Sequence, residues 1–153
     1  MPILSEFLGA GRVGVLDQAT SRDAVLEAAA RLLGDGSPEA TAAIADSLRQ
    51  RERLGSTAIG HGVAIPHGRS GVCRDTRAAF LRLQPAVDFA ATDGIPVDLV
   101  LAMAAPEQFT QQHLQLLSEI AERFADPAFR EALRAAPDAD ALRAALTGTV
   151  AAS

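Results

Sequence analysis

The spacing of apolar positions predicts two consecutive helices near the start of the chain. The string Thr20-Ser21-Arg22-Asp23 resembles a capping box, and a glycine-rich turn at 34–36 is expected to end the first helix. Ser37 followed by Pro38 starts a second helix, which ends at Leu54-Gly55. Both stretches carry apolar residues at helical spacing: Val25, Ala29, Leu32 and Leu33 in the first, and Ala40, Ile44 and Leu48 in the second.

The middle of the chain changes to strand-like patterns. Between Ser56 and Gly71, four glycines and a proline interrupt a short β-branched segment, which predicts a strand entering a shaped loop. Two strands are predicted to follow, at Thr76–Leu83 and Val97–Ala104. The second is apolar on both faces apart from Asp98, as expected of a strand that helices cover on both sides.

Helical patterns return in the last third of the chain. After Pro106 a helix is expected to begin near Thr110, with a buried stripe formed by Leu117, Ile120, Ala121 and Phe124. Two short helices at 127–136 and 138–146 follow, and the tail 147–153 is expected to fray. Helices and strands alternate without a long linker, so the pattern predicts an α/β chain that forms one layered domain over residues 1–153.

Composition narrows the possible functions. The 153 residues are 48% hydrophobic and 22% charged, with a net charge of −5, which disfavours binding to nucleic acid or to anionic membranes. All basic residues are Arg, so lysine-dependent Schiff-base and P-loop chemistry is excluded. The single cysteine, Cys73, excludes an intrachain disulfide and a cysteine-based zinc cluster. No long apolar run or signal-like start is evident, so no membrane insertion and a cytoplasmic location are expected.

The candidate chemistry lies between Arg51 and Gly68. His67 follows Pro66, which stiffens the backbone before the imidazole. Glycines allow backbone N–H groups to approach a ligand closely, while hydroxyl and guanidinium groups supply further donors. The phosphate-binding groups expected around His67 are Arg51, Ser56, Thr57, Gly60, Gly62 and Gly68. The set contains no ring of carboxylates, so it indicates a phosphate-binding site centred on this histidine.

His113 is the second candidate imidazole. It lies four residues before Leu117, so we expect it on the buried face in the first turn of the predicted helix. The positive end of the helix dipole opposes an imidazolium there. A neutral ring could donate one N–H to a phosphoryl oxygen, which the same helix end attracts.

His61 is the third imidazole, placed between Gly60 and Gly62. Two interpretations are open: an exposed loop residue without a role, or a neighbour of His67 that makes the site sensitive to pH. A zinc site built from the three histidines is a different class of function. None of them has the carboxylate spacing of known zinc motifs, so no metal and no cofactor are expected.

The segment from Arg51 to Gly68 resembles the signature of the type-2 IIA domains of the bacterial phosphoenolpyruvate:sugar phosphotransferase system. The string Gly55-Ser56-Thr57-x-Ile59-Gly60-x-Gly62-x-Ala64-Ile65-Pro66-His67-Gly68 is most similar to the nitrogen-regulatory branch of that family. The order of the predicted elements is also similar over almost the whole chain. The resemblance implies a mixed parallel and antiparallel sheet flanked by helices.

The resemblance also implies roles for three residues. In this family the histidine of the Ala-Ile-Pro-His-Gly string accepts a phosphoryl group from a small phosphocarrier protein, which makes His67 the phosphorylated nucleophile. His113 would be the imidazole that hydrogen-bonds the phosphoryl group. Arg51 would neutralise the phosphoryl charge or contact the carrier.

The implied partners are an HPr-like phosphocarrier and target proteins whose activity follows the phosphorylation state, among them potassium transporters or sensor kinases. The alternative is a free-standing fructose- or mannitol-type IIA component that passes the phosphoryl group to a IIB domain. The Gly55-Ser56-Thr57 string and the absence of fused IIB or IIC segments favour the regulatory branch. A binding module with a degenerate site is disfavoured because Arg51, His67 and His113 are all present.

Overall fold

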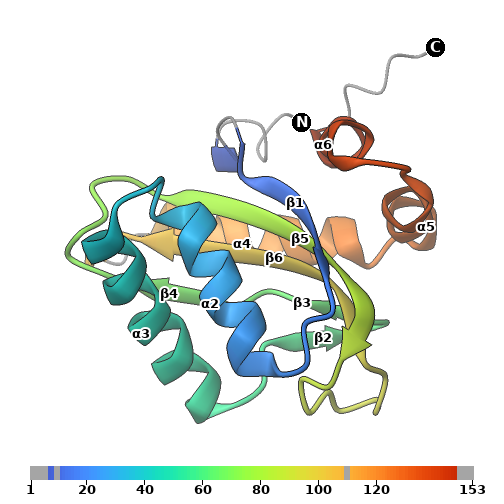
Figure 1. Ribbon diagram of the computed structural model, residues 1–153, viewed down its shortest axis with the longest axis horizontal. Helices are drawn as coiled ribbons and strands as arrows, with labels where there is room; N and C mark the ends of the chain where they lie inside the picture. The colour runs from blue at the N-terminus through green and yellow to red at the C-terminus, as the bar shows by residue number, and fades with distance from the viewer. Residues whose placement is uncertain (1–6, 9–10, 109–110, 148–153) are drawn as a thin grey trace.

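The fold is α/β, with helices on both faces of one mixed sheet. The computed structural model describes residues 7–8, 11–108 and 111–147, with the side chains of 111–113 outside that set. Its strands are β1 (Val13–Asp17), β2 (Ala58–Gly60), β3 (Val63–Ala64), β4 (His67–Arg69), β5 (Arg77–Val87) and β6 (Val97–Ala105). Its helices are α2 (Arg22–Leu33), α3 (Pro38–Leu54), α4 (Gln111–Phe124), α5 (Pro127–Ala135) and α6 (Ala139–Thr147). The strand order is β1-β5-β6-β3-β2, and β4 also pairs with β6 (Figure 1), so the predicted class is confirmed.

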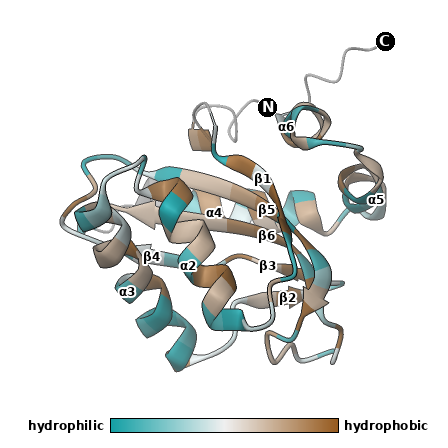
Figure 2. Cartoon of the chain, viewed as in Figure 1, coloured by the Kyte–Doolittle hydropathy of each residue, from teal (hydrophilic) through white to brown (hydrophobic). Residues whose placement is uncertain are grey.

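Strand β6 divides the core into two layers, because successive side chains of a strand point to opposite faces. Val100 and Ala102 belong to the core under α2 and α3, whereas Leu101 and Met103 belong to the core under the three C-terminal helices. Figure 1 shows α2 and α3 in front of the sheet and α4 behind it. Figure 2 shows the apolar residues along the central strands and polar residues along α3. Only Asp98 within β6 is less than fully buried, which confirms the prediction of a strand covered on both sides.

Strands β3 and β4 are two parts of one extended segment that runs parallel to β6. Val63 pairs with Leu99 and His67 pairs with Met103, so the same register continues through both strands. The ladder is interrupted at Pro66, which has no backbone N–H to donate. Its carbonyl still accepts a hydrogen bond from the Met103 N–H at 2.9 Å. Within the predicted strand and shaped loop at 56–71, residues 63–69 therefore form a strand with a proline break, and a tight turn precedes it at 61–62.

The helix boundaries follow their capping residues. Ser21 is the N-cap of α2, since its backbone is extended and its hydroxyl accepts the Ala24 N–H at 3.1 Å. The cap therefore lies one residue later than the capping box at Thr20 predicted. Ser37 caps α3 in the same way and Gly55 ends that helix, as expected from the sequence.

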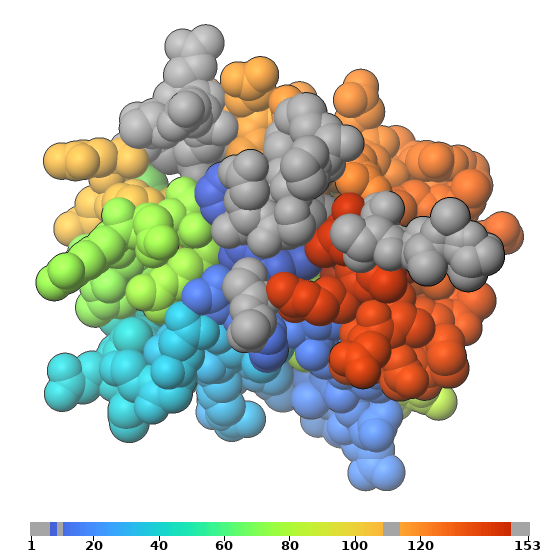
Figure 3. Space-filling model, turned by 90° about the horizontal axis from the view of Figure 1, so that it is seen from above, coloured from blue at the N-terminus to red at the C-terminus, as the bar shows by residue number. Residues whose placement is uncertain are grey.

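The sequence pattern did not predict β1. This strand lies at one edge of the sheet and pairs in parallel with β5, where Val13 is opposite Phe80. Helix α6 packs against β1, and Figure 3 shows the red of α6 beside the blue of this strand. Strand β5 also continues four residues beyond the predicted end at Leu83, to Val87, with an irregular register after Arg82.

The buried stripe of helix α4 begins at Leu116, one residue before the predicted position Leu117. Leu116, Ile120 and Phe124 are buried, while Leu117 and Ala121 are half-buried. The last two helices lie within one or two residues of their predicted bounds, and the tail beyond α6 is outside the described residues. Among the described helices, none has the length and apolar character needed to cross a membrane.

Candidate functional site

An open pocket of about 690 Å³ lies where the last turns of α3 meet β4. It brings together three of the predicted site residues, Arg51, His67 and Gly68. The rest of its lining is Ser47, Gln50, Leu54, Arg69 and Glu107. Four of the lining residues come from α3, at positions 47, 50, 51 and 54. Their spacing places them on one face of that helix, and this signal for a shared surface is visible in the sequence.

His67 lies in β4 and is partly exposed. Paired residues of adjacent strands point to the same face, so His67 shares the face of Met103, which α4 covers. Its Nδ1 lies 3.0 Å from the carbonyl oxygen of Ile65. A carbonyl oxygen can only accept, so Nδ1 carries the proton in the neutral ring and the lone pair of Nε2 is available for attack.

Gly68 faces the opposite way, toward α3. A Cβ at this position would lie 2.3 Å from Ser47 Oγ and 3.1 Å from the Ser47 carbonyl carbon. The Ser47 hydroxyl donates to the Arg69 carbonyl at 2.7 Å, which joins α3 to β4 at the same point. Gly68 therefore permits close contact between helix and strand, and that contact brings the end of α3 beside His67.

Two arginines supply positive charge to the pocket. Arg51 Nη1 donates to the Gly55 carbonyl at 2.9 Å, which uses one of the five N–H donors of its guanidinium. Arg69 Nη1 lies 3.5 Å from the Glu107 carbonyl oxygen. Both side chains line the same pocket as His67. Arg69 was not predicted from the sequence, although it follows the His-Gly pair directly.

Ser56 and Thr57 do not line this pocket, and their side chains have internal partners. The Ser56 hydroxyl donates to the Phe89 carbonyl and also accepts the Ala58 N–H. The Thr57 hydroxyl and N–H both donate to the buried carboxylate of Glu52, at 2.6 and 3.0 Å. The structure therefore uses these hydroxyls to hold the chain between α3 and β2.

Gly60 is the last residue of β2 and Gly62 lies in the tight turn that leads to β3, and neither glycine lines the His67 pocket. Both have positive φ angles, and so does His61 between them. The His61 N–H donates to Asp93 Oδ2 at 2.9 Å, and this backbone hydrogen bond is the main cause of a lowered pKa at Asp93. A Cβ on Gly62 would lie 2.6 Å from Arg134 Nη2, so the glycine allows that guanidinium to cover the turn.

His61 lines a separate pocket of about 370 Å³. Arg134 crosses this pocket, donating to both carboxylate oxygens of Asp98 and to the His61 carbonyl. His61 and His67 thus face different pockets. Among the described side chains, no group of three His, Cys, Asp or Glu residues comes close enough to hold a metal ion.

His113 is the third residue of α4, so the backbone there is in the first helical turn, as predicted. Its side chain lies outside the described residues, and so does Thr110, the predicted N-cap. Helix α4 covers the face of the sheet to which His67 belongs. The backbone of His113 therefore belongs to the helix that covers the face of the sheet on which His67 lies.

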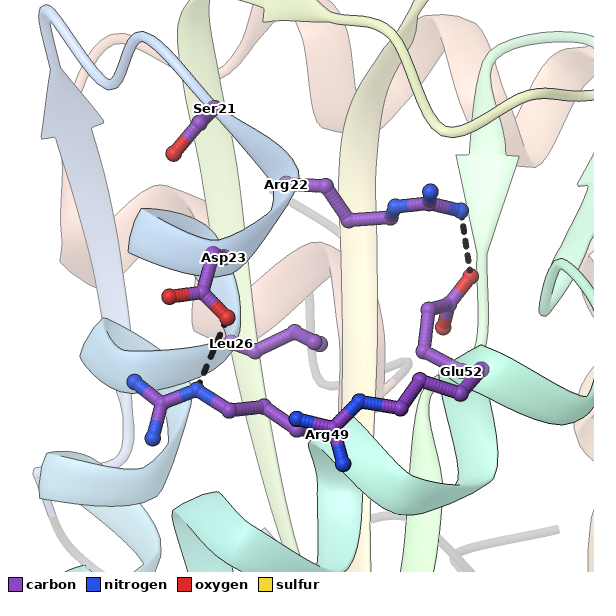
Figure 4. Close-up of a pocket in the computed structure, with 7 residues that line it drawn as sticks. Ser21, Arg22, Asp23, Leu26, Arg49 and Glu52 are labelled. Carbon is purple, nitrogen blue, oxygen red and sulfur yellow. Dashed lines mark hydrogen bonds and ion pairs between the residues drawn. The ribbon is translucent and has the colours of Figure 1, made fainter.

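A further pocket of about 330 Å³ lies between α2 and α3 (Figure 4). Arg49 pairs there with Asp23 at 2.8 Å, and Arg22 pairs with Glu52 at 3.4 Å. Glu52 is only 5% exposed, so it is the buried member of these ion pairs. The same carboxylate accepts the two hydrogen bonds from Thr57, which connects this pocket to the segment that leads to His67.

Known proteins resemble the chain over most of its length. The profile described as "Phosphoenolpyruvate-dependent sugar phosphotransferase system, EIIA 2" matches residues 6–148. The nitrogen regulatory protein of Pseudomonas aeruginosa is 43% identical over 140 residues, which is 91% of this chain and 91% of that protein. The crystal structure of nitrogen regulatory protein IIA-Ntr from Neisseria meningitidis has a TM-score of 0.86 at 38% identity, covering 95% of this chain and 99% of that one. The 2-O-alpha-mannosyl-D-glycerate-specific EIIABC component of Escherichia coli is 33% identical over 130 residues, 83% of this chain but 20% of that protein.

Proposed function

Because the chain belongs to the EIIA type 2 family of the phosphoenolpyruvate-dependent sugar phosphotransferase system, we propose that it is a regulatory protein that accepts a phosphoryl group on His67. The observation that carries the proposal is the hydrogen bond from His67 Nδ1 to the Ile65 carbonyl. It leaves Nε2 as the nucleophilic atom, in a pocket that also contains two arginines.

The donor in this proposal is an HPr-like phosphocarrier that carries a phosphohistidine. The Nε2 lone pair of neutral His67 forms a bond to phosphorus while the P–N bond of the donor breaks in line with it. A donor ring that is protonated at its other nitrogen leaves as a neutral imidazole. The ring of His67 keeps its Nδ1 proton and gains a positive charge, which the Ile65 carbonyl dipole stabilises. No net proton transfer is required.

The surrounding groups supply position and charge. Arg51 offers guanidinium donors to the phosphoryl oxygens, and Arg69 adds a second positive charge at the mouth of the pocket. His113, which the family resemblance pairs with the acceptor histidine, would donate a further N–H from the first turn of α4. Such preorganised donors stabilise the transferring group without reorganisation during the reaction.

Regulation is the favoured use of this chemistry. The sequence identity of the chain is 43% to the Pseudomonas aeruginosa nitrogen regulatory protein and 33% to the sugar-specific EIIABC component. The match also covers 91% of the regulatory protein but only 20% of the sugar-specific component. In this proposal the phosphorylation state of His67 in the cytoplasm controls a partner protein. A sugar-type IIA that passes the group to a IIB domain is the competing function.

Intact-mass measurement after incubation with phosphoenolpyruvate, enzyme I and the phosphocarrier tests the acceptor. We expect a gain of one phosphoryl group at alkaline pH, where phosphohistidine survives. The gain should be absent in His67→Ala and present in His61→Ala, a matched control because His61 lines a different pocket. Phosphorylation that persists in His67→Ala would refute the acceptor, and rapid transfer to a IIB domain would favour the sugar-type function.

A further inference from the structure

A chain of hydrogen bonds connects the buried carboxylate of Glu52 to the ring of His67. Glu52 accepts the Thr57 hydroxyl at 2.6 Å and the Thr57 N–H at 3.0 Å. The Thr57 carbonyl accepts the Ile65 N–H at 3.0 Å. The Ile65 carbonyl in turn faces His67 Nδ1 at 3.0 Å. Each link in this chain is therefore a direct hydrogen bond of ordinary length.

This chain holds the backbone of Ile65 from the side of β2, while the buried Ile65 side chain anchors the residue in the core under the C-terminal helices. Pro66 follows directly and donates no hydrogen bond, so the segment is held on one side by the Thr57 carbonyl and on the other by the Met103 N–H at 2.9 Å. Thr57 itself is fixed by Glu52, which lies on the last turn of α3. Helix α3 therefore contributes, through Glu52 and Thr57, to the orientation of the carbonyl that selects the histidine tautomer.

Glu52 has the properties of a positioning group and lies away from the reacting atoms. Its carboxylate is buried, and it does not line the His67 pocket. Two carboxylate oxygens are needed to accept both Thr57 donors, since each donor takes a different oxygen. Arg22, at 3.4 Å, balances the charge of the buried carboxylate from α2.

We propose that Glu52 and Thr57 form a clasp that holds His67 in the Nδ1-protonated tautomer, so that Nε2 is presented for phosphoryl transfer. Both are positioning residues, and the inference rests on the proposed function for its catalytic consequence. Its structural part, the control of the tautomer, does not depend on any phosphocarrier. Loss of the clasp frees the Ile65 carbonyl to move and allows the ring to adopt the other tautomer.

Three substitutions test the clasp in the full chain. Thr57→Val removes the hydroxyl and keeps the branched shape, and Glu52→Gln leaves one oxygen for two donors. Thr57→Ser keeps the hydroxyl and should behave as wild type. Glu39→Gln is the matched control, because Glu39 is an exposed carboxylate in the first turn of the same helix. Urea unfolding of each variant identifies those that remain folded under the assay conditions.

The first readout is the ¹H–¹⁵N imidazole spectrum at alkaline pH, where the rings are neutral and the protonated nitrogen is distinguished by its ¹⁵N shift. The His67 signals are identified by their loss in His67→Ala. We expect Nδ1–H as the major form in wild type, Thr57→Ser and Glu39→Gln, and a mixture of tautomers in Thr57→Val and Glu52→Gln. An unchanged tautomer in folded Thr57→Val and Glu52→Gln would overturn the clasp, whether or not the protein is phosphorylated.

The second readout is the rate of phosphoryl acceptance from the phosphocarrier. We expect the maximal single-turnover rate constant to fall by roughly 10- to 100-fold in Thr57→Val and Glu52→Gln, because a small misplacement of a reacting group has an effect of this order. The carrier concentration that gives half of the maximal rate should stay within about twofold of wild type, since neither residue lines the pocket. A changed tautomer with an unchanged maximal rate constant would overturn the catalytic role of the clasp. Absence of phosphorylation in wild type would refute the proposed function and leave the tautomer result intact.

Discussion

Replacement of Gly68 by alanine tests whether this glycine serves the contact between α3 and β4. The new Cβ would lie 2.3 Å from Ser47 Oγ, whereas carbon atoms in favourable contact lie about 3.5–4.0 Å apart. Rotation of Ser47 would relieve this clash only by breaking its hydrogen bond to the Arg69 carbonyl. The Ser47 carbonyl carbon, at 3.1 Å, is backbone and yields only if the whole helix moves.

The expected cost follows from these contacts. Loss of the Ser47 hydrogen bond costs about 1 kcal/mol, and overpacking of a tight contact adds about 1–3 kcal/mol. The reduced freedom of alanine in the unfolded chain returns about 0.4–1 kcal/mol. We therefore expect Gly68→Ala to lower the free energy of unfolding by about 1 to 3.5 kcal/mol, measured by urea denaturation.

A double-mutant cycle with Ser47→Gly isolates the contact. Ser47→Gly alone should cost about 1 to 2 kcal/mol, because it loses the hydrogen bond, worth about 1 kcal/mol, and because glycine is a poorer helix former than serine by about 0.5 kcal/mol. In that background Gly68→Ala should cost at least about 1 kcal/mol less than in wild type, because the Oγ and Cβ that it meets are gone. An equal cost in both backgrounds would show that the contact with Ser47 is not what requires glycine. The packing explanation also predicts that the double variant accepts phosphoryl groups better than Gly68→Ala alone.

Two further predictions concern titrating groups away from the site. Arg12 donates two hydrogen bonds to Asp35, which lowers the pKa of that carboxyl below its usual 3.8. Asp35→Asn should therefore reduce the free energy of unfolding by up to about 1 kcal/mol near neutral pH, since the pair is partly exposed. This difference from wild type should vanish as the pH falls below 3.8 through the lowered pKa of Asp35. Urea denaturation at several pH values measures the difference, and a difference that grows in acid would contradict the pairing. Burial raises the pKa of the Cys73 thiol, so iodoacetamide should modify native protein far more slowly than protein unfolded in urea, as followed by intact mass; equal rates would contradict the buried position.

The sequence predicted the helices and strands whose capping residues or apolar pattern lie within their own residues. Helices α2 and α3 have caps and an apolar face within their own residues, and β6 has an apolar run on both faces. Strand β1 has neither kind of signal. Its five residues include Gly14, and its register is set by pairing with β5, more than sixty residues later in the chain. A short edge strand of this kind is defined by tertiary contacts.

The same distinction applies to the site. The residues from Ile65 to Gly68 are consecutive in the chain, so the sequence alone shows that they form one motif. The residue types of Ser56 and Thr57 suggest phosphate donors, whereas in the structure both hydroxyls have partners within the protein. The Ser56 acceptor, the Phe89 carbonyl, is distant in the sequence, and the Thr57 acceptor, Glu52, lies on the last turn of α3. Hydroxyl groups bind whichever acceptor the fold brings to them, so their residue type alone does not reveal that acceptor.

The strand geometry explains why histidine is followed by glycine in this string. Successive residues of β4 point to opposite faces, so His67 faces the side of α4 while Gly68 faces α3. Helix α3 can place Arg51 beside His67 only if it approaches β4 closely, and a side chain at position 68 would prevent that approach. Ile65, two residues before the histidine, shares its face, and its carbonyl is the acceptor that selects the tautomer. A shift of one residue in the pairing of β4 with β6 would exchange these faces, so the position of the nucleophile and the approach of the helix are fixed by the same register.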